Sequence, residues 1–139
     1  MYYKHSICHP ENPEIEYPDQ KLTAEQIRET VRKYPWKQEL QKLKTLRPDE
    51  INYSPSVNFS NLQDHHSLCL TVEGEPDDFR FSVFYNRPVK RKVLFGLLRE
   101  KVVMEVIDKP FNAQGAFRLL ELFLKQEYSS IEKAYAFGE

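Results

Sequence analysis

Alternation of apolar and polar residues between positions 67 and 108 constrains the fold of this chain more than any other sequence feature. Leu68, Leu70 and Val72 alternate with smaller neighbours, and residues 79–86 repeat the pattern with Phe, Val and Tyr at odd positions. Successive side chains of a strand point to opposite faces of a sheet, so this period of two predicts β-strands that each bury one face.

Turn residues divide this stretch. The acidic segment 73–78 contains Gly74 and Pro76, which favour a chain reversal. Pro88 cannot donate a backbone hydrogen bond, so a second reversal is predicted over 87–90, followed by strands at 93–98 and 102–107. Connections this short cannot hold a parallel crossover. The sequence therefore predicts an antiparallel meander within 56–108, with four strands, or five if residues 56–60 add an edge strand.

Helix signals flank the predicted sheet. Thr23 and Gln26 form a capping-box pattern, and apolar residues at helical spacing follow on both sides of Pro35, so a helical pair is predicted over 23–46. Asn112 is a suitable N-cap for a long helix over 113–128, which we expect to pack on the sheet and to be followed by a short docked segment. The predicted C-terminal helical segment spans 112–137.

The predicted fold class is α+β, as one domain over residues 1–139. Three prolines among acidic residues predict that residues 1–22 form an extended arm. Neither a signal peptide nor a run of about 20 apolar residues is present, and two cysteines are too few for a disulfide framework. These observations favour a cytoplasmic protein.

Metal and catalytic signals are weak. His5, Cys8, His9, His65 and His66 are of the residue types that zinc prefers, but their spacing matches no zinc motif. The glycines stand alone, so no phosphate-binding loop is indicated. We therefore assign no catalytic residues, no metal site and no cofactor from the sequence.

Two surface features are expected from the meander. The acidic turn 73–78 and the basic residues 87–92 should lie at opposite ends of the sheet. The less apolar sheet face should carry a mixture of polar and apolar side chains, which is typical of a surface that a partner covers. The predicted binding residues are Arg80, Phe84, Arg87, Lys90, Arg91, Lys92, Val103 and Glu105.

The function predicted from these features is a small non-enzymatic binding or regulatory module that contacts a protein partner, or a second copy as a homodimer. One alternative is a small-ligand or enzyme pocket between the sheet and the C-terminal helix, lined by Phe79, Phe81, Tyr85 and Phe117. Another is nucleic-acid binding through the basic turn. That alternative is disfavoured because twenty basic and twenty-one acidic residues give a net charge of -1.

Overall fold

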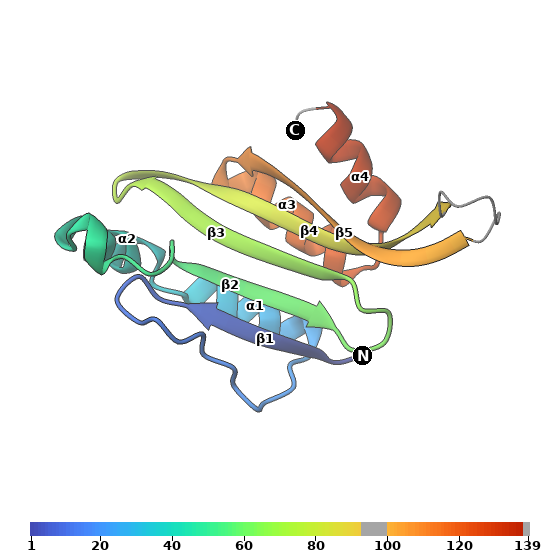
Figure 1. Cartoon of the computed structure of the whole chain (residues 1–139), viewed down its shortest axis with the longest axis horizontal. Helices are drawn as coiled ribbons and strands as arrows, with labels where there is room; N and C mark the ends of the chain where they lie inside the picture. Colours follow the sequence, from blue (N-terminus) through green and yellow to red (C-terminus); the bar gives the residue numbers. More distant parts are fainter. Residues whose placement is uncertain (93–99, 138–139) are drawn as a thin grey trace.

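The computed structural model describes residues 1–92 and 100–137. Within these ranges the chain forms an α+β fold with a five-stranded antiparallel sheet and four α-helices (Figure 1). The strands follow one another across the sheet in sequence order: β1 (Tyr3–Cys8), β2 (Ser56–Asn61), β3 (Ser67–Glu75), β4 (Asp78–Lys92) and β5 (Glu100–Phe111). The helices are α1 (Ala24–Lys33), α2 (Trp36–Thr45), α3 (Ala113–Leu124) and α4 (Tyr128–Phe137).

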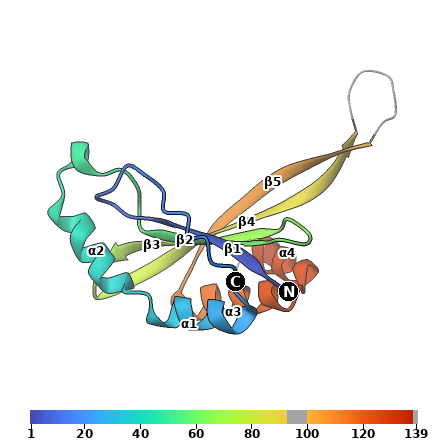
Figure 2. The same ribbon diagram turned by 90° about the horizontal axis from the view of Figure 1, so that it is seen from below.

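One face of the sheet forms the core. Figure 2 shows α1, α3 and α4 on this face. The strand residues on it are fully buried: Val57, Phe59, Leu68, Leu70, Val72, Phe81, Val83 and Tyr85. Each such side chain contributes about 1.5–3 kcal/mol on burial, so this face is the main source of stability.

Two helix starts predicted from the sequence are confirmed. Thr23 accepts a hydrogen bond from the amide of Gln26, and the Gln26 side chain accepts one from the Thr23 amide. The Asn112 side chain accepts a hydrogen bond from the amide of Gly115 at the start of α3. These bonds satisfy amides that have no partner inside a helix.

The first predicted reversal is also confirmed. Glu75 at the end of β3 pairs directly with Asp78 at the start of β4, and Gly74 just before the turn has a φ of +104°. A Cβ at Gly74 would lie 3.0 Å from the carbonyl oxygen of Asp78, so both the conformation and the space favour glycine.

The second predicted reversal, over 87–90, is wrong. β4 continues through Pro88 to Lys92, and Pro88 lies directly opposite Met104 of β5. The pairing of β3 with β4 ends at Asn86, so beyond that residue β4 has β5 as its only neighbour among the described residues. A proline is tolerated there because one edge of the strand is free. The strand predicted at 93–98 lies outside the described residues.

The N-terminal segment differs from a simple extended arm, because Tyr3–Cys8 is strand β1 and pairs with β2. Its outer edge is partly covered by the following segment. Backbone hydrogen bonds join Tyr3 to Leu22 and Ile7 to Glu16, with lengths of 2.8 and 2.9 Å. Residues 9–22 are thereby held along the edge of the sheet.

The helix predicted over 113–128 ends earlier than expected, and the short docked segment expected after it is a second helix. α3 ends at Leu124, the chain passes through Gln126 at a φ of 59°, and α4 begins at Tyr128. The Tyr135 hydroxyl donates to the carbonyl of Val83, which fixes α4 to the centre of β4. No helix in the described part of the chain is both long and apolar enough to cross a membrane.

The two faces of the sheet should respond differently to the same substitution. We expect Val83→Thr to lower the free energy of unfolding by about 1–3 kcal/mol, because Val83 is fully buried and the new hydroxyl loses its hydration. Val106→Thr is the matched control, since Val106 is 57% exposed, and it should change the stability by less than about 0.5 kcal/mol. Urea denaturation of both variants measures the difference. Equal effects would contradict the assignment of faces.

Candidate interaction surface

The ends of β4 and β5 form a two-stranded arm, defined here as residues 87–92 and 100–106. Figure 2 shows that this arm projects beyond the other strands, away from the side of the sheet on which α1, α3 and α4 lie. It projects because β3 begins at Ser67, which pairs with Asn86, whereas the ladder between β4 and β5 continues to the pair Lys92–Glu100.

The face of the arm that continues the uncovered sheet face carries a row of exposed apolar residues. Val102, Met104 and Val106 are 60%, 47% and 57% exposed. Directly opposite them on β4 lie Lys90, Pro88 and Asn86. We call Val102, Met104 and Val106 the apolar row. Three adjacent apolar side chains on one strand face, left in solvent, are typical of a contact surface.

Two lysines extend this surface toward the end of the arm. Lys90 lies opposite Val102, and Lys92 lies opposite Glu100. Both lysines are exposed, and neither forms an ion pair with a described residue. At the other end of the apolar row, exposed Asp108 lies opposite half-buried Phe84. Because exposed Glu100 lies beside Lys92, the lysine end carries a net charge of +1, and the surface runs from there, across apolar side chains, to Asp108.

The other face of the arm is occupied by ion pairs. The Arg91 guanidinium donates two hydrogen bonds to the carboxylate of Glu105, at 2.6 and 2.5 Å. Arg87 donates to the Glu105 carbonyl at 3.0 Å and to the Glu132 carboxylate of α4 at 3.3 Å. The hydrogen bonds from Arg91 hold the pKa of Glu105 below its ordinary value. These contacts shape the arm and fix its base to α4.

The structure separates the predicted binding residues into two groups. Phe84, Lys90, Lys92 and Arg80 belong to the uncovered face, and Arg80 lies near the acidic turn, opposite Glu73. The remaining four, Arg87, Arg91, Val103 and Glu105, lie on the helix side. Placing Val103 and Glu105 beside Phe84 was wrong, because the register of β5 against β4 puts Val102, Met104 and Val106 on the uncovered face instead.

Charge is distributed unevenly between the arm region and the rest of the chain. Residues 87–107 contain six of the twenty basic residues and two of the twenty-one acidic ones, so this segment carries +4 and the remainder -5. The acidic turn lies at the opposite end of β4. It is partly neutralised by α2, because Lys37 pairs with Asp77 and Lys44 with Glu75.

The four predicted pocket residues also fall into two groups. Phe81 and Tyr85 are fully buried in the core. Phe79 and Phe117 line a hollow of about 420 Å³, which is bounded by α1 and α3 rather than by the sheet and the C-terminal helix alone. Trp36 also lines it and was not predicted to do so.

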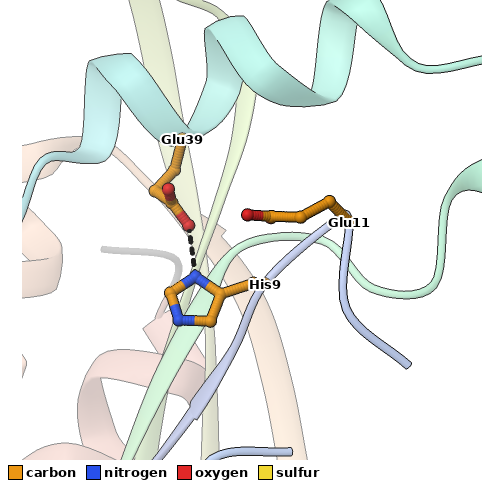
Figure 3. Close-up of side chains that lie close together, drawn as sticks. All are labelled: His9, Glu11 and Glu39. Carbon is orange, nitrogen blue, oxygen red and sulfur yellow. Dashed lines mark hydrogen bonds and ion pairs between the residues drawn. The ribbon is translucent and has the colours of Figure 1, made fainter. Parts of the chain in front are cut away.

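The histidines considered for zinc lie apart. His5 stacks on Phe59 on the helix side of β1, whereas Cys8 lies on the opposite face of that strand. His9 joins Glu39 of α2 and Glu11, as Figure 3 shows. Its Nδ1 is 2.7 Å from Glu39 Oε1, and its Nε2 is 3.4 Å from a carboxylate oxygen of Glu16.

The positively charged side chain of Lys42 also contacts this group. The Lys42 ammonium lies 2.9 Å from Glu39 and 3.3 Å from Glu11. Glu39 is only 3% exposed, and an unpaired buried carboxylate is costly. His9 and Lys42 therefore provide the charge that allows Glu39 to be buried, and the cluster holds the segment after β1 against α2.

A second polar cluster fixes α4 to the loop between β2 and β3. The His66 ring stacks on Tyr128 with centroids 3.8 Å apart, and its Nδ1 is 2.7 Å from the Tyr85 hydroxyl. The Tyr128 hydroxyl donates to Asp64 at 2.6 Å. Burial lowers the pKa of His66, so the neutral ring is favoured. From the sequence, His66 was considered only as a possible zinc ligand, so this role was missed.

No protein-family model matches this chain, and no match was found among curated proteins or solved structures. Function is therefore inferred from the surfaces described above.

The ion pair between His9 and Glu39 should make stability depend on pH. Burial acts to lower the pKa of His9, but hydrogen bonds to Glu39 and Glu16, with the charges of Glu39 and Glu11, raise it overall. The folded state thus binds the His9 proton more tightly than the unfolded state does. This stabilisation is complete below the ordinary histidine pKa of about 6.5 and is lost as pH rises through the higher folded value.

We expect His9→Gln to lower the free energy of unfolding by about 1–2 kcal/mol at low pH, with a smaller effect as pH rises. Urea denaturation of both proteins between about pH 5.5 and 8.5 measures this difference. The pKa shifts of His5 and His66 cancel in the comparison. His65→Asn is the control, because His65 is exposed and its φ of 65° suits asparagine. A His9→Gln effect that grew with pH would contradict the assignment.

Proposed function

We propose that the protein is a non-enzymatic binding module that associates with a second copy of itself through the uncovered face of the arm. The observation that carries this proposal is the apolar row on a projecting two-stranded element, with lysines at one end and an aspartate at the other. A soluble protein gains stability by burying such a row, and burial in a second subunit is one direct way to do so.

The two ends of this face carry opposite net charges, so two copies of the face can pack with unlike ends together. In a twofold packing of two arms face to face, centred on Met104, the level of Glu100 in one copy meets the level of Asp108 in the other. Lys92 lies at the level of Glu100. The proposed packing therefore brings the lysine end of each copy, where Lys90, Lys92 and Glu100 sum to +1, toward Asp108 of the second copy. The opposite net charges of these two ends favour the contact.

The proposed association is weak. Covering three half-exposed side chains in each of two copies contributes about 6 kcal/mol in total, and the entropic cost of association offsets part of it. We therefore expect a dimer Kd of about 0.1–1 mM.

The titratable clusters outside the arm support a binding role over a catalytic one. His9, Glu39 and Lys42 pair with one another, and His66 is held by Tyr85 and Tyr128. Their contacts are sufficiently explained by the need to bury polar groups and to join elements that are distant in sequence.

Sedimentation equilibrium from about 5 to 500 µM protein tests the proposal. We expect reversible dimerisation that Met104→Glu weakens at least tenfold, because the carboxylate would be buried against the second copy. Ile51→Glu is the matched control: Ile51 is 39% exposed but lies outside the arm, and the variant should dimerise as the wild type does. A strict monomer at the highest concentration, or equal effects of both variants, would overturn the proposal.

A charge exchange tests the orientation. We expect Lys92→Glu and Asp108→Lys each to weaken the dimer about threefold to tenfold, because each places like charges opposite one another. The double variant should restore most of the affinity. If the two effects add instead, Lys92 and Asp108 do not meet, and the antiparallel packing is wrong.

A further inference from the structure

The hollow between α1 and α3 lies on the helical side of the molecule. Its volume is about 420 Å³, within the range of small-molecule sites. Apolar side chains from four elements form its walls: Val31, Trp36, Phe79, Ala113, Phe117 and Leu120. Phe117 is 36% exposed although it belongs to a helix that packs on the core, so apolar surface remains open here.

Aromatic rings give the hollow a defined shape. Trp36 meets Phe81 edge to face, with centroids 5.0 Å apart, and Phe81 in turn contacts Phe117 at 5.5 Å and Phe79 at 5.8 Å. Phe81 is buried beneath the hollow and supports the three rings that line it. Flat aromatic walls favour a planar ring as the occupant, by offset or edge-to-face stacking.

The polar groups at the hollow already have partners. The Trp36 indole donates its N–H to the Val31 carbonyl at 3.1 Å. Arg28 of α1 bonds to Glu121 of α3 at 2.7 Å and to Glu25 at 3.2 Å. Arg32 forms an ion pair with Glu29. A charged occupant would therefore have to compete with ion pairs that are formed without it, whereas a neutral one would not.

From this geometry we propose that the hollow is a binding site for a neutral, apolar small molecule with a planar ring. The Arg28–Glu121 ion pair joins the two helices beside the hollow and holds them at this spacing. The site does not depend on the arm, which belongs to the end of β4, whereas Phe79 is the second residue of that strand.

N-phenyl-1-naphthylamine is a suitable probe because it is neutral, apolar and aromatic. Trp36 is the single tryptophan of the chain, so energy transfer from its indole reports a probe bound within the hollow. We expect saturable quenching of the Trp36 emission with a Kd below about 100 µM. Absence of saturable transfer would overturn the proposal.

A second probe tests whether the ligand must be neutral. 1-Anilinonaphthalene-8-sulfonate has the same ring skeleton with an added sulfonate. We expect it to bind at least ten times more weakly than the neutral probe, because the rim charges are already paired. Equal or tighter binding of the sulfonate would overturn the assignment of a neutral ligand.

A filling variant locates the site. Ala113→Leu adds three carbons at the wall, in the first turn of α3, and should weaken probe binding at least tenfold. Ala136→Leu makes the same change at an exposed position of α4 and should leave binding unchanged. Phe117→Ala, which removes one aromatic wall, should also weaken binding. Circular dichroism checks that each variant is folded, and unchanged binding in folded Ala113→Leu and Phe117→Ala would place the probe elsewhere.

Discussion

The single buried face of the sheet is the constraint on which the rest of the structure depends. In the pairing of β3 with β4, Leu68, Leu70 and Val72 stand opposite Tyr85, Val83 and Phe81, and all six are fully buried. A slip of one residue would turn these side chains into solvent, so this register is strongly preferred. Because α1, α3 and α4 cover the same face, the opposite face and the arm stay open (Figure 2).

Elements with local signals could be predicted from the sequence. The Thr23–Gln26 capping box, the reversal after Gly74 and the Asn112 cap each depend on residues within a few positions of one another. Pro88 was wrongly predicted to end a strand, because proline is excluded only from strands that pair with a neighbour on both sides. Local sequence does not show that β3 stops pairing at Asn86. Because of that error, residues 87–92 were not assigned to β4. The pairing of these residues with β5 decides which β5 residues lie on the open face, so that assignment was wrong as well.

The residues of the candidate sites also divide into those with a local sequence signal and those brought together only by the fold. Phe79 and Phe117 could be predicted as wall residues because an aromatic side chain on a strand or helix signals burial or contact. Trp36 could not be placed beside them, since it reaches the hollow only through the packing of helices that lie about 80 residues apart in sequence. His9 and Glu39 are likewise joined by tertiary structure. Neither contact joins residues at a sequence spacing that a known motif would predict.

The two kinds of basic residue in the arm have different physical roles. Arg87 and Arg91 use planar guanidinium groups to hold Glu105 and Glu132, so their charge is spent within the molecule and their geometry stiffens the arm. Lys90 and Lys92 are exposed and form no ion pair with a described residue, so in the proposed dimer they can contact a second copy without breaking an existing ion pair. The arm therefore combines a shape fixed by arginine with a charge presented by lysine, and its apolar row lies on the lysine side. In the proposed dimer, the second copy would therefore meet the lysines on the same face on which the apolar row can be buried.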